Sequence, residues 1–144
     1  MKLSTKSRYA LRAIIELDAM SEGKPIFVRE IAKRQDISER YLENIFTQLR
    51  ASGVLISIKG KNGGFKLAKD PKEINLLEIV TAVEGKLSIV ECAGNPNSCA
   101  KSADCVSRDI WDEINTTLVE KIGSYRLDEI IARHNKDIAL EYNI

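Results

Sequence analysis

Residues 54–67 have the pattern of a β-hairpin, and no other segment narrows the possible folds of this 144-residue chain so sharply. Apolar residues alternate in Val54-Leu-Ile-Ser-Ile-Lys59 and again in Phe65-Lys-Leu67. Between them, Gly60-Lys-Asn-Gly-Gly64 contains an Asn-Gly pair, which is the strongest short signal for a hairpin turn. The hairpin is also basic, because Lys59, Lys61 and Lys66 lie at or near its tip.

Three helices are predicted before the hairpin. The first begins after Ser4, a favourable N-cap residue, and the second covers residues 28–35. Ser38 caps the third, whose apolar residues recur at helical spacing: Tyr41, Leu42, Ile45, Phe46 and Leu49. Two short helices with a tight connection, followed by a basic hairpin, form a winged helix-turn-helix. In that fold the third helix enters the major groove of DNA and the wing contacts phosphates or the minor groove.

The second half of the chain is predicted to be helical around one loop. Asn75 and Glu78 have capping-box spacing at the start of a fourth helix, which Gly85 ends. A loop over residues 86–104 precedes a long amphipathic helix from about Ala103 to Ile122, with Gly123 as its C-cap. A last short helix covers about residues 127–135, and the tail 138–144 is undecided. The expected fold is therefore mainly α with a small β-hairpin.

The long helix predicts a homodimer. Its apolar positions exceed what so small a protein can cover: Val106, Ile110, Trp111, Ile114, Leu118 and Ile122. We expect it to pair with its copy, since a two-fold protein reads a palindromic operator in double-stranded DNA. An internal core helix of a monomer is the alternative. We accordingly expect a DNA-binding domain over residues 1–85, a cysteine-bearing loop over 86–105, and dimerisation and C-terminal helices over 103–144.

The distribution of charge agrees with a DNA partner. Residues 1–69 contain 14 Lys/Arg and 7 Asp/Glu, whereas residues 70–144 contain 8 and 14, so a net +7 and a net −6 make up the overall +1. A basic first half is attracted to a polyanion, although solvated surface charge would give the same count. No apolar run approaches the roughly 18 residues of a membrane span, and none follows the basic N-terminus. We expect a cytoplasmic protein with no membrane association.

Three cysteines, Cys92, Cys99 and Cys105, lie within 14 residues. Their odd number argues against a disulfide framework. Thiolates are soft, charged donors that suit iron–sulfur clusters, whereas zinc usually shows a Cys-x2-Cys pair, which this chain lacks. A metal-free thiol–disulfide switch and a loop of idle thiols are further alternatives. An enzyme is disfavoured, because the single histidine has no catalytic partners in its region of the sequence and the chain has no phosphate-binding glycine loop.

Several motifs together resemble one family of bacterial winged-helix regulators. They are Leu3-Ser-Thr-Lys-Ser-Arg-Tyr-Ala10, Ile37-Ser-Glu-Arg-Tyr-Leu-Glu43, the following Leu49-Arg50 and Gly53, and Gly60-Lys-Asn-Gly-Gly-Phe65. The family includes the iron–sulfur cluster assembly regulator IscR, the nitric-oxide sensor NsrR and the cysteine-metabolism repressor CymR. The resemblance covers nearly the whole chain. It implies a homodimer crossed on the long helix and, in members with cysteines, an iron–sulfur cluster in the loop before that helix.

The cysteine spacing, Cys92-x6-Cys99-x5-Cys105, resembles the cluster-binding version of the family. By resemblance to IscR we favour a 2Fe–2S over a 4Fe–4S cluster. The fourth ligand is unassigned, because the places of the IscR histidine and of the NsrR aspartate are taken here by Arg108 and Arg8. A guanidinium has no lone pair to give. The remaining candidates are Glu91, Asp104, Ser107, Asp109, His134 or an exogenous ligand.

The resemblance also implies which residues contact DNA. Arg40, Glu43 and Asn44 would lie on the exposed start of the third helix, where a carboxylate accepts from cytosine and an asparagine pairs with adenine. Glu43 matches a residue that IscR uses to discriminate between classes of site, and Lys59 matches a wing arginine. The full expected set is Arg8, Arg29, Ser38, Arg40, Glu43, Asn44, Arg50, Lys59 and Lys61.

Together these features and the resemblance predict an iron–sulfur-cluster-sensing, sequence-specific DNA-binding regulator, expected to be a repressor. The resemblance implies cluster assembly genes as its targets. The alternative is a winged-helix repressor with no cluster. It would be gated by a thiol switch or, as in the CymR branch, by a protein partner.

Overall fold

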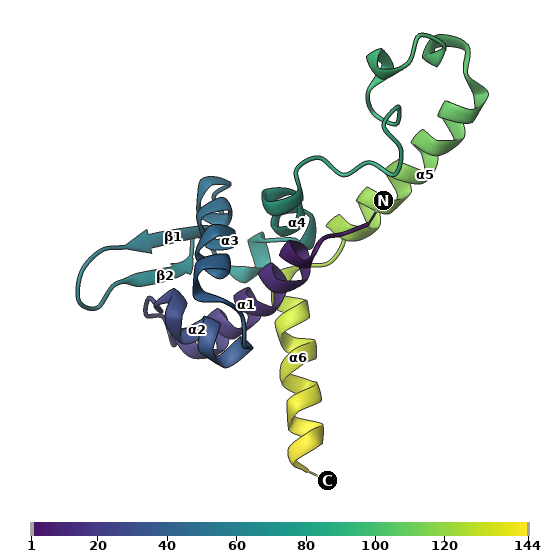
Figure 1. The fold of residues 1–144 in the computed structure, drawn as a ribbon. Coiled ribbons are helices and arrows are strands. Elements are labelled where there is room, and N and C mark those ends of the chain that lie inside the picture. The colour runs from purple at the N-terminus through teal and green to yellow at the C-terminus, as the bar shows by residue number, and fades with distance from the viewer. Residues whose placement is uncertain (1, 144) are drawn as a thin grey trace.

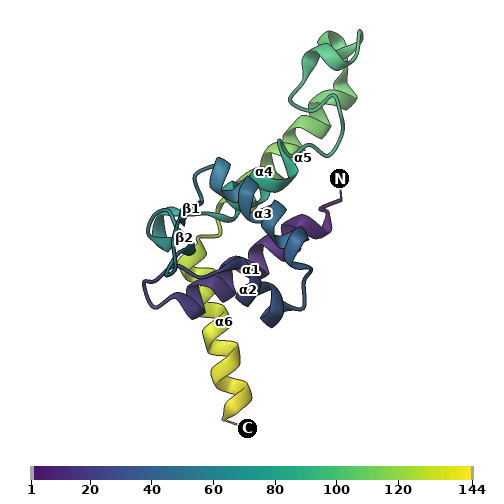
Figure 2. The ribbon, with the colours of Figure 1, turned by 60° about the vertical axis from the view of Figure 1, so that its left-hand side comes forward.

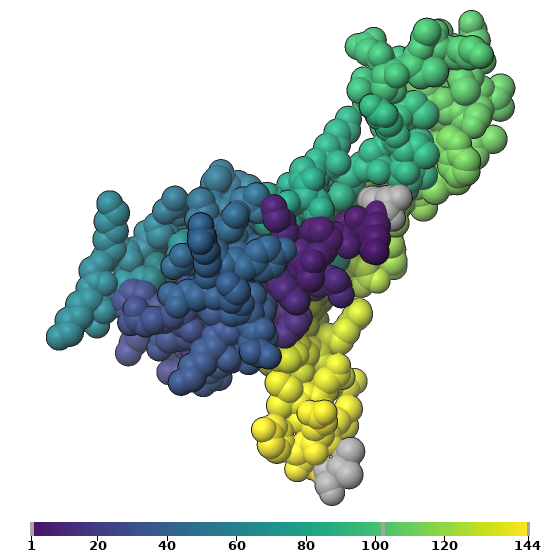
Figure 3. Space-filling view, in the orientation of Figure 1, coloured from purple at the N-terminus to yellow at the C-terminus, as the bar shows by residue number. Residues whose placement is uncertain are grey.

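The computed structural model describes residues 2–143 and divides into a helical body and a projecting arm (Figures 1 and 3). In chain order the elements are α1 (Thr5–Ser21), α2 (Val28–Gln35), α3 (Glu39–Ala51), β1 (Leu55–Ile58), β2 (Gly64–Leu67), η1 (Pro71–Glu73), α4 (Leu76–Glu84), η2 (Pro96–Ser98), η3 (Ser102–Asp104), α5 (Val106–Gly123) and α6 (Leu127–Tyr142). The body contains α1 to α4 and the hairpin, and α5 carries the cysteine loop away from it. The predicted fold class, mainly helical with one small hairpin, is confirmed.

Side-chain caps begin three helices where the sequence predicts them. Ser4 Oγ accepts from the Lys6 amide at 3.2 Å, and Ser38 Oγ accepts from the Tyr41 amide at 3.3 Å. At α4 the capping box is complete: Asn75 Oδ1 accepts from the Glu78 amide at 3.0 Å, and the Glu78 carboxylate accepts from the Asn75 amide at 2.9 Å. Each cap satisfies amide groups that lack a partner in the first helical turn.

The apolar core lies where α1, α2, α3 and α4 meet the base of the wing. Leu42, Ile45, Phe46 and Leu49 of α3 are completely buried, as expected. The Phe46 ring packs edge-to-face on Phe65 of β2, with ring centroids 5.2 Å apart. Tyr41, placed on the same stripe by the sequence, is only half-buried, because it lies at the edge of the core.

The wing is a two-stranded antiparallel hairpin fastened to the body. Its register pairs Leu55 with Leu67 at the base. Phe65 also exchanges two backbone hydrogen bonds, of 2.9 and 2.8 Å, with Ile26. Ile26 lies in the link between α1 and α2. Gly64 makes this approach possible, because a Cβ there would lie 2.4 Å from the Ile26 carbonyl. The chain therefore needs glycine at this point of the turn.

The ends of the last two helices differ from the prediction. The long helix α5 begins at Val106 rather than near 103, because 102–104 form a separate 3₁₀ turn. Gly123 lies in its last turn, and Ser124 is the C-cap. The last helix does not stop near 135 but continues to Tyr142, since neither Gly nor Pro interrupts it. It thereby includes most of the tail that the sequence left undecided, while Ile144 lies outside the described residues.

The junction of α5 and α6 is anchored in the body, although most of α5 is not. Leu127 is fully buried and its amide donates to the Ile74 carbonyl at 2.8 Å. By contrast, the predicted apolar positions in the first half of α5 are exposed, with Val106 at 72%, Ile110 at 50% and Ile114 at 46%. Leu118 and Ile122, nearer the junction, are half-buried. Within residues 2–143, no helix combines the length and hydrophobicity that spanning a membrane requires.

Candidate DNA-binding surface and cysteine loop

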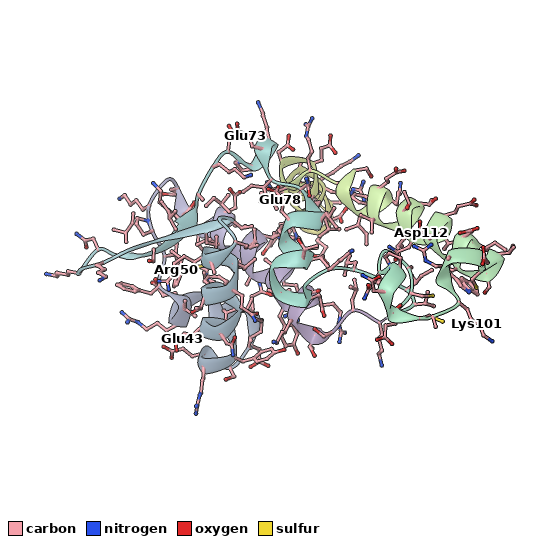
Figure 4. The ribbon with its side chains drawn as sticks, turned by 90° about the horizontal axis from the view of Figure 1, so that it is seen from above. Glu43, Arg50, Glu73, Glu78, Lys101 and Asp112 are labelled. Carbon is pink, nitrogen blue, oxygen red and sulfur yellow. The ribbon has the colours of Figure 1, made fainter. Side chains whose placement is uncertain are left out.

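One face of α3 is free while the opposite face is buried in the core. Arg40, Glu43, Asn44, Thr47 and Arg50 are all exposed, and Figure 4 shows Glu43 and Arg50 on the same helix. The expected base-reading residues are thus accessible. The candidate Ser38 is exposed as well, but its oxygen already accepts the capping hydrogen bond at the start of α3.

A hollow of about 330 Å³ separates the start of α2 from α3 and β2. Its lining includes two expected DNA contacts, Arg29 and Glu43, beside residues of the wing. The complete lining is Phe27, Val28, Arg29, Glu39, Glu43, Thr47, Gly64 and Phe65. The Arg29 guanidinium lies 4.4 Å from the centre of the Phe27 ring, which limits its range of positions. Sequence reasoning missed Phe27 and Thr47, although Thr47 is one helical turn after Glu43 and on the same face.

The basic candidates surround this face on separate elements. Lys59 and Lys61 are exposed at the wing tip. Arg50 joins α3 to the wing, because its Nη1 donates to Ser57 Oγ at 3.3 Å. Arg8 is exposed on α1 beside Tyr9, whose ring contacts that of Tyr41 on α3 with centroids 5.9 Å apart. The fold therefore brings cations from α1, α2, α3 and the wing to the region of the candidate recognition helix.

The cysteine loop lies at the far end of α5, away from α3, as the views in Figures 1 and 2 show. Figure 4 shows Lys101 and Asp112 at that end, opposite Glu43. Cys92 and Cys105 are half-buried and Cys99 is exposed. Cys105 is the N-cap of α5, and its Sγ accepts from the Arg108 amide at 3.4 Å.

The donor chemistry of the three thiols suits a cluster, but the described loop does not gather them. Among residues 2–143, no three His, Cys, Asp or Glu side chains lie together in a metal-binding group. Arg108, in the place of the IscR histidine, instead donates from Nε to the Cys92 carbonyl at 3.3 Å. The loop therefore offers three ligands only if it closes to bring the three thiols together. Another candidate, Ser107, accepts from Trp111 Nε1 at 3.0 Å, and His134 belongs to α6, beyond the opposite end of α5.

Glu84 connects the start of α1 to the end of α4, directly before the loop. Its Oε1 accepts from the Ser4 amide at 2.8 Å, from Ser4 Oγ at 2.5 Å and from Ser7 Oγ at 2.7 Å. Burial alone would raise the pKa of Glu84, but these hydrogen bonds and the charge of Lys6 outweigh it and lower the pKa below its ordinary value. The carboxylate is therefore charged at neutral pH and holds the two helix ends together.

Comparison with known proteins extends over nearly the whole chain. Residues 3–133 match the model of the Rrf2 family, described as iron-dependent transcriptional regulators. A Neisseria meningitidis protein named as an HTH-type transcriptional regulator is 35% identical over 94% of this chain and 90% of its own length. The regulator IscR of Pectobacterium atrosepticum is 30% identical over 96% of this chain and 82% of its own.

Solved structures show the same fold. CymR, the global cysteine regulator of B. subtilis, superimposes with a TM-score of 0.74 and 31% identity, covering 92% of this chain and 98% of that one. IscR of T. potens gives a TM-score of 0.72 with 28% identity, covering 93% and 88%. The exposed α3 face, the wing and the matched length agree with these likenesses, and the chain belongs to the Rrf2 family of transcriptional regulators, which are DNA-binding proteins and not enzymes.

Proposed function

We propose that this Rrf2-family regulator is a homodimer that reads a palindromic operator and senses an iron–sulfur cluster through Cys92, Cys99 and Cys105. The observation that carries the proposal is the separation of two accessible sites. The free face of α3 lies on the body, and three thiols lie in one loop at the tip of α5. A sensor of this kind needs a DNA surface and a signal surface joined by a rigid element, which α5 and its anchored junction supply.

The DNA part of the proposal assigns roles by chemistry. Arg40, Glu43 and Asn44 read base edges, since they occupy the free face near the start of α3. The remaining candidates, Arg8, Arg29, Ser38, Arg50, Lys59 and Lys61, contact phosphates and fix the register. The apolar stripe of α5 supports the dimer, because Ile110 and Ile114 are half exposed in the single chain.

The cluster part assigns the three cysteine thiolates as ligands of a cluster, with 2Fe–2S favoured by the likeness to IscR. When bound, such a cluster supplies an iron centre whose retention depends on iron supply and oxidants. Closing the loop acts on the start of α5 through Cys105, its N-cap, and the other end of α5 is anchored in the body. A population shift between two positions of α5 then changes how α3 fits DNA. Cluster assembly genes are the proposed targets, also from the likeness to IscR. The fourth ligand stays open among Glu91, Asp104, Ser107, Asp109, His134 and an external donor.

The deciding experiment is purification without oxygen, followed by an absorption spectrum and by iron and sulfide counts per chain. We expect a coloured protein with matched iron and sulfide, and loss of both in Cys92→Ser, Cys99→Ser or Cys105→Ser. A colourless, iron-free protein that resists reconstitution would contradict the cluster part and leave the DNA-binding part standing.

The DNA roles are tested by selecting bound sequences from a random DNA pool. Glu43→Ala should change the preferred base at one position of each half-site, while Lys61→Ala should keep the preference and reduce the slope of log affinity against log salt by about 1. Glu73→Ala, at an exposed carboxylate outside the α3 face, is the matched control and should leave the preference unchanged. An unchanged preference in Glu43→Ala contradicts the assigned reading role.

A second candidate function is a cluster-free regulator gated by a thiol switch or a protein partner. Two observations favour it: Arg108 in place of a cluster ligand, and the likeness to CymR, of which a Staphylococcus aureus relative has been solved in an oxidised form. This candidate predicts colourless protein with full DNA affinity. Loss of affinity on peroxide treatment would then indicate the switch, and unchanged affinity would indicate the partner.

A further inference from the structure

Three side chains on one face of α5 hold the first part of the cysteine loop. Arg108, Asp112 and Asn115 are spaced by four and three residues, so they share a face of the helix. Arg108 Nε donates to the Cys92 carbonyl at 3.3 Å, and Asp112 Oδ1 accepts from the Gly94 amide at 3.1 Å. We call these three residues the α5 ladder.

Asn115 completes the ladder at the base of the loop. It is the buried residue of α5, with 9% exposure, and its Oδ1 accepts from the Ile89 amide at 2.9 Å. Its Nδ2 donates to the Leu87 carbonyl at 3.4 Å. A buried amide that pairs with two backbone groups fixes them strongly, because breaking either bond leaves a buried polar group without a partner.

The held segment, residues 87–94, also has bonds of its own. Lys86 Nζ donates to the Gly94 carbonyl at 3.0 Å, and Ser88 Oγ donates to the Ala93 carbonyl at 3.0 Å. Gly94 has φ +75°, a conformation that favours glycine, and in it the amide of this residue points at Asp112. The segment therefore has a defined shape against α5, and Cys92 is part of that shape.

Residues 95–104 differ from the held segment. The side chains of Asn95 and Ser98 bond within the η2 turn, at 3.3 Å to the Asn97 amide and at 2.9 Å to the Asn95 carbonyl. Cys99 follows that turn and is exposed. Cys105, beyond the segment, is tied to α5 as its N-cap.

We propose that Arg108 is a positioning residue: with Asp112 and Asn115 it fixes the Cys92 segment against the first turns of α5, which Cys105 caps, before any cluster binds. The outer segment with Cys99 then moves when the loop closes. The proposal rests on the proposed function, because holding Cys92 in place serves a purpose only if the loop binds a cluster. The preformed arrangement itself is a property of the protein alone. It gives the arginine a role at a position where it cannot be a ligand.

The test measures alkylation of each cysteine by iodoacetamide in metal-free, reduced full-length protein, read by mass spectrometry. Each rate is divided by that of the same cysteine in the unfolded chain, which removes differences in intrinsic reactivity. In the wild type, Cys92 should react more slowly than Cys99. In Arg108→Ala and in Asp112→Ala, Cys92 should react about fivefold faster, as expected for the loss of one hydrogen bond, while Cys99 stays unchanged.

Two matched controls are acidic residues elsewhere on α5, Glu113→Ala and Glu120→Ala. Both are exposed, and among the described residues neither side chain is hydrogen-bonded to the loop, so both should leave Cys92 protected. Arg108→Lys should give an intermediate rate, since an ammonium can still donate to the Cys92 carbonyl. Equal rates for Cys92 and Cys99 in the wild type, or no acceleration beyond that of the controls, would overturn the proposal.

The result is separable from that of the cluster experiment. If the wild type never takes up iron yet Cys92 loses its protection in the two ladder variants, the cluster function fails and the ladder stands. If the wild type takes up iron but the ladder variants keep Cys92 protected and load equally well, the cluster function stands and the ladder fails.

Discussion

The body and the arm of this protein are stabilised in different ways. In the body, α3 buries four apolar side chains completely and places its polar residues on the outer face. In the arm, α5 buries Asn115 alone, leaves its aliphatic residues half exposed, and holds the loop through polar side chains. The body can therefore keep a DNA-binding surface in one shape, whereas the arm depends on further contacts. That division suits a regulator in which the DNA surface is constant and the signal acts on the arm.

The largest expected effect is in the body, from Phe46→Ala. Phe46 is fully buried and packs edge-to-face on Phe65 across the base of the wing, so the variant leaves a cavity. The free energy of unfolding should fall by about 3–5 kcal/mol, measured by urea denaturation. Trp111→Ala in the arm is the comparison and should cost a single chain far less, because that ring is 41% exposed. Equal losses would remove the distinction between the two regions.

The wing of the body gives the next effect, through Gly64→Ala. The new Cβ would lie 2.4 Å from the Ile26 carbonyl, so the backbone bridge to Phe65 has to shift. We expect a loss of about 2–3 kcal/mol and weaker operator binding, by denaturation and by fluorescence anisotropy. Gly60→Ala is the control, since its φ is also positive but nothing lies within 4 Å. If both variants lose the same free energy of unfolding, the strain of a positive φ, and not contact with Ile26, explains the result.

In the arm, Ile114→Glu tests whether the exposed stripe of α5 is the proposed dimer interface. A buried charge at such an interface should weaken self-association by about 2 kcal/mol, roughly 30-fold, seen by sedimentation equilibrium. The thermal unfolding of the body should change little. Thr116→Glu adds the same charge on another face of α5 and should leave the dimer intact. Dissociation in both variants, or in neither, would place the interface elsewhere.

The smallest effect concerns Glu84, which joins the body to the start of the loop. Because its pKa is lower in the folded than in the unfolded protein, the carboxylate stabilises the fold above its ordinary pKa of 4.5, and this stabilisation is lost as the pH falls through the folded-state value. Glu84→Gln should cost about 1 kcal/mol at pH 7, kept small by partial solvent exposure.

The measurement for Glu84 is urea denaturation of the wild type and the variant between pH 3 and pH 7. The difference in unfolding free energy should shrink below pH 4.5. Ser7→Ala, which removes one of the hydroxyls that donate to Glu84, should reproduce part of this dependence. A difference that is constant with pH would mean that the charge of Glu84 is not what holds α1 to α4.

Local signals predicted the body well. Ser4, Ser38 and Asn75 each cap a helix through their own side chains, so a few consecutive residues are sufficient to mark the starts. The same is true of the hairpin, whose Asn-Gly turn and alternating residues specify a register without distant contacts. The predicted end of the last helix near residue 135 is wrong, because no helix-breaking residue occurs before Tyr142.

By itself, the sequence determined the winged-helix fold, the exposed face of α3 and the presence of three thiols in one loop, because these depend on residue spacing within short segments. Only the tertiary structure decided which side chains and backbone groups meet across the chain. The Ile26–Phe65 bridge, the Glu84 contacts with Ser4 and Ser7, and the α5 ladder each join residues far apart in sequence. Such pairs leave no periodic pattern in the sequence, since they form only once the helices are packed. The sequence alone therefore indicates only that Arg108 cannot be a ligand, whereas the structure shows its hydrogen bond to the Cys92 carbonyl.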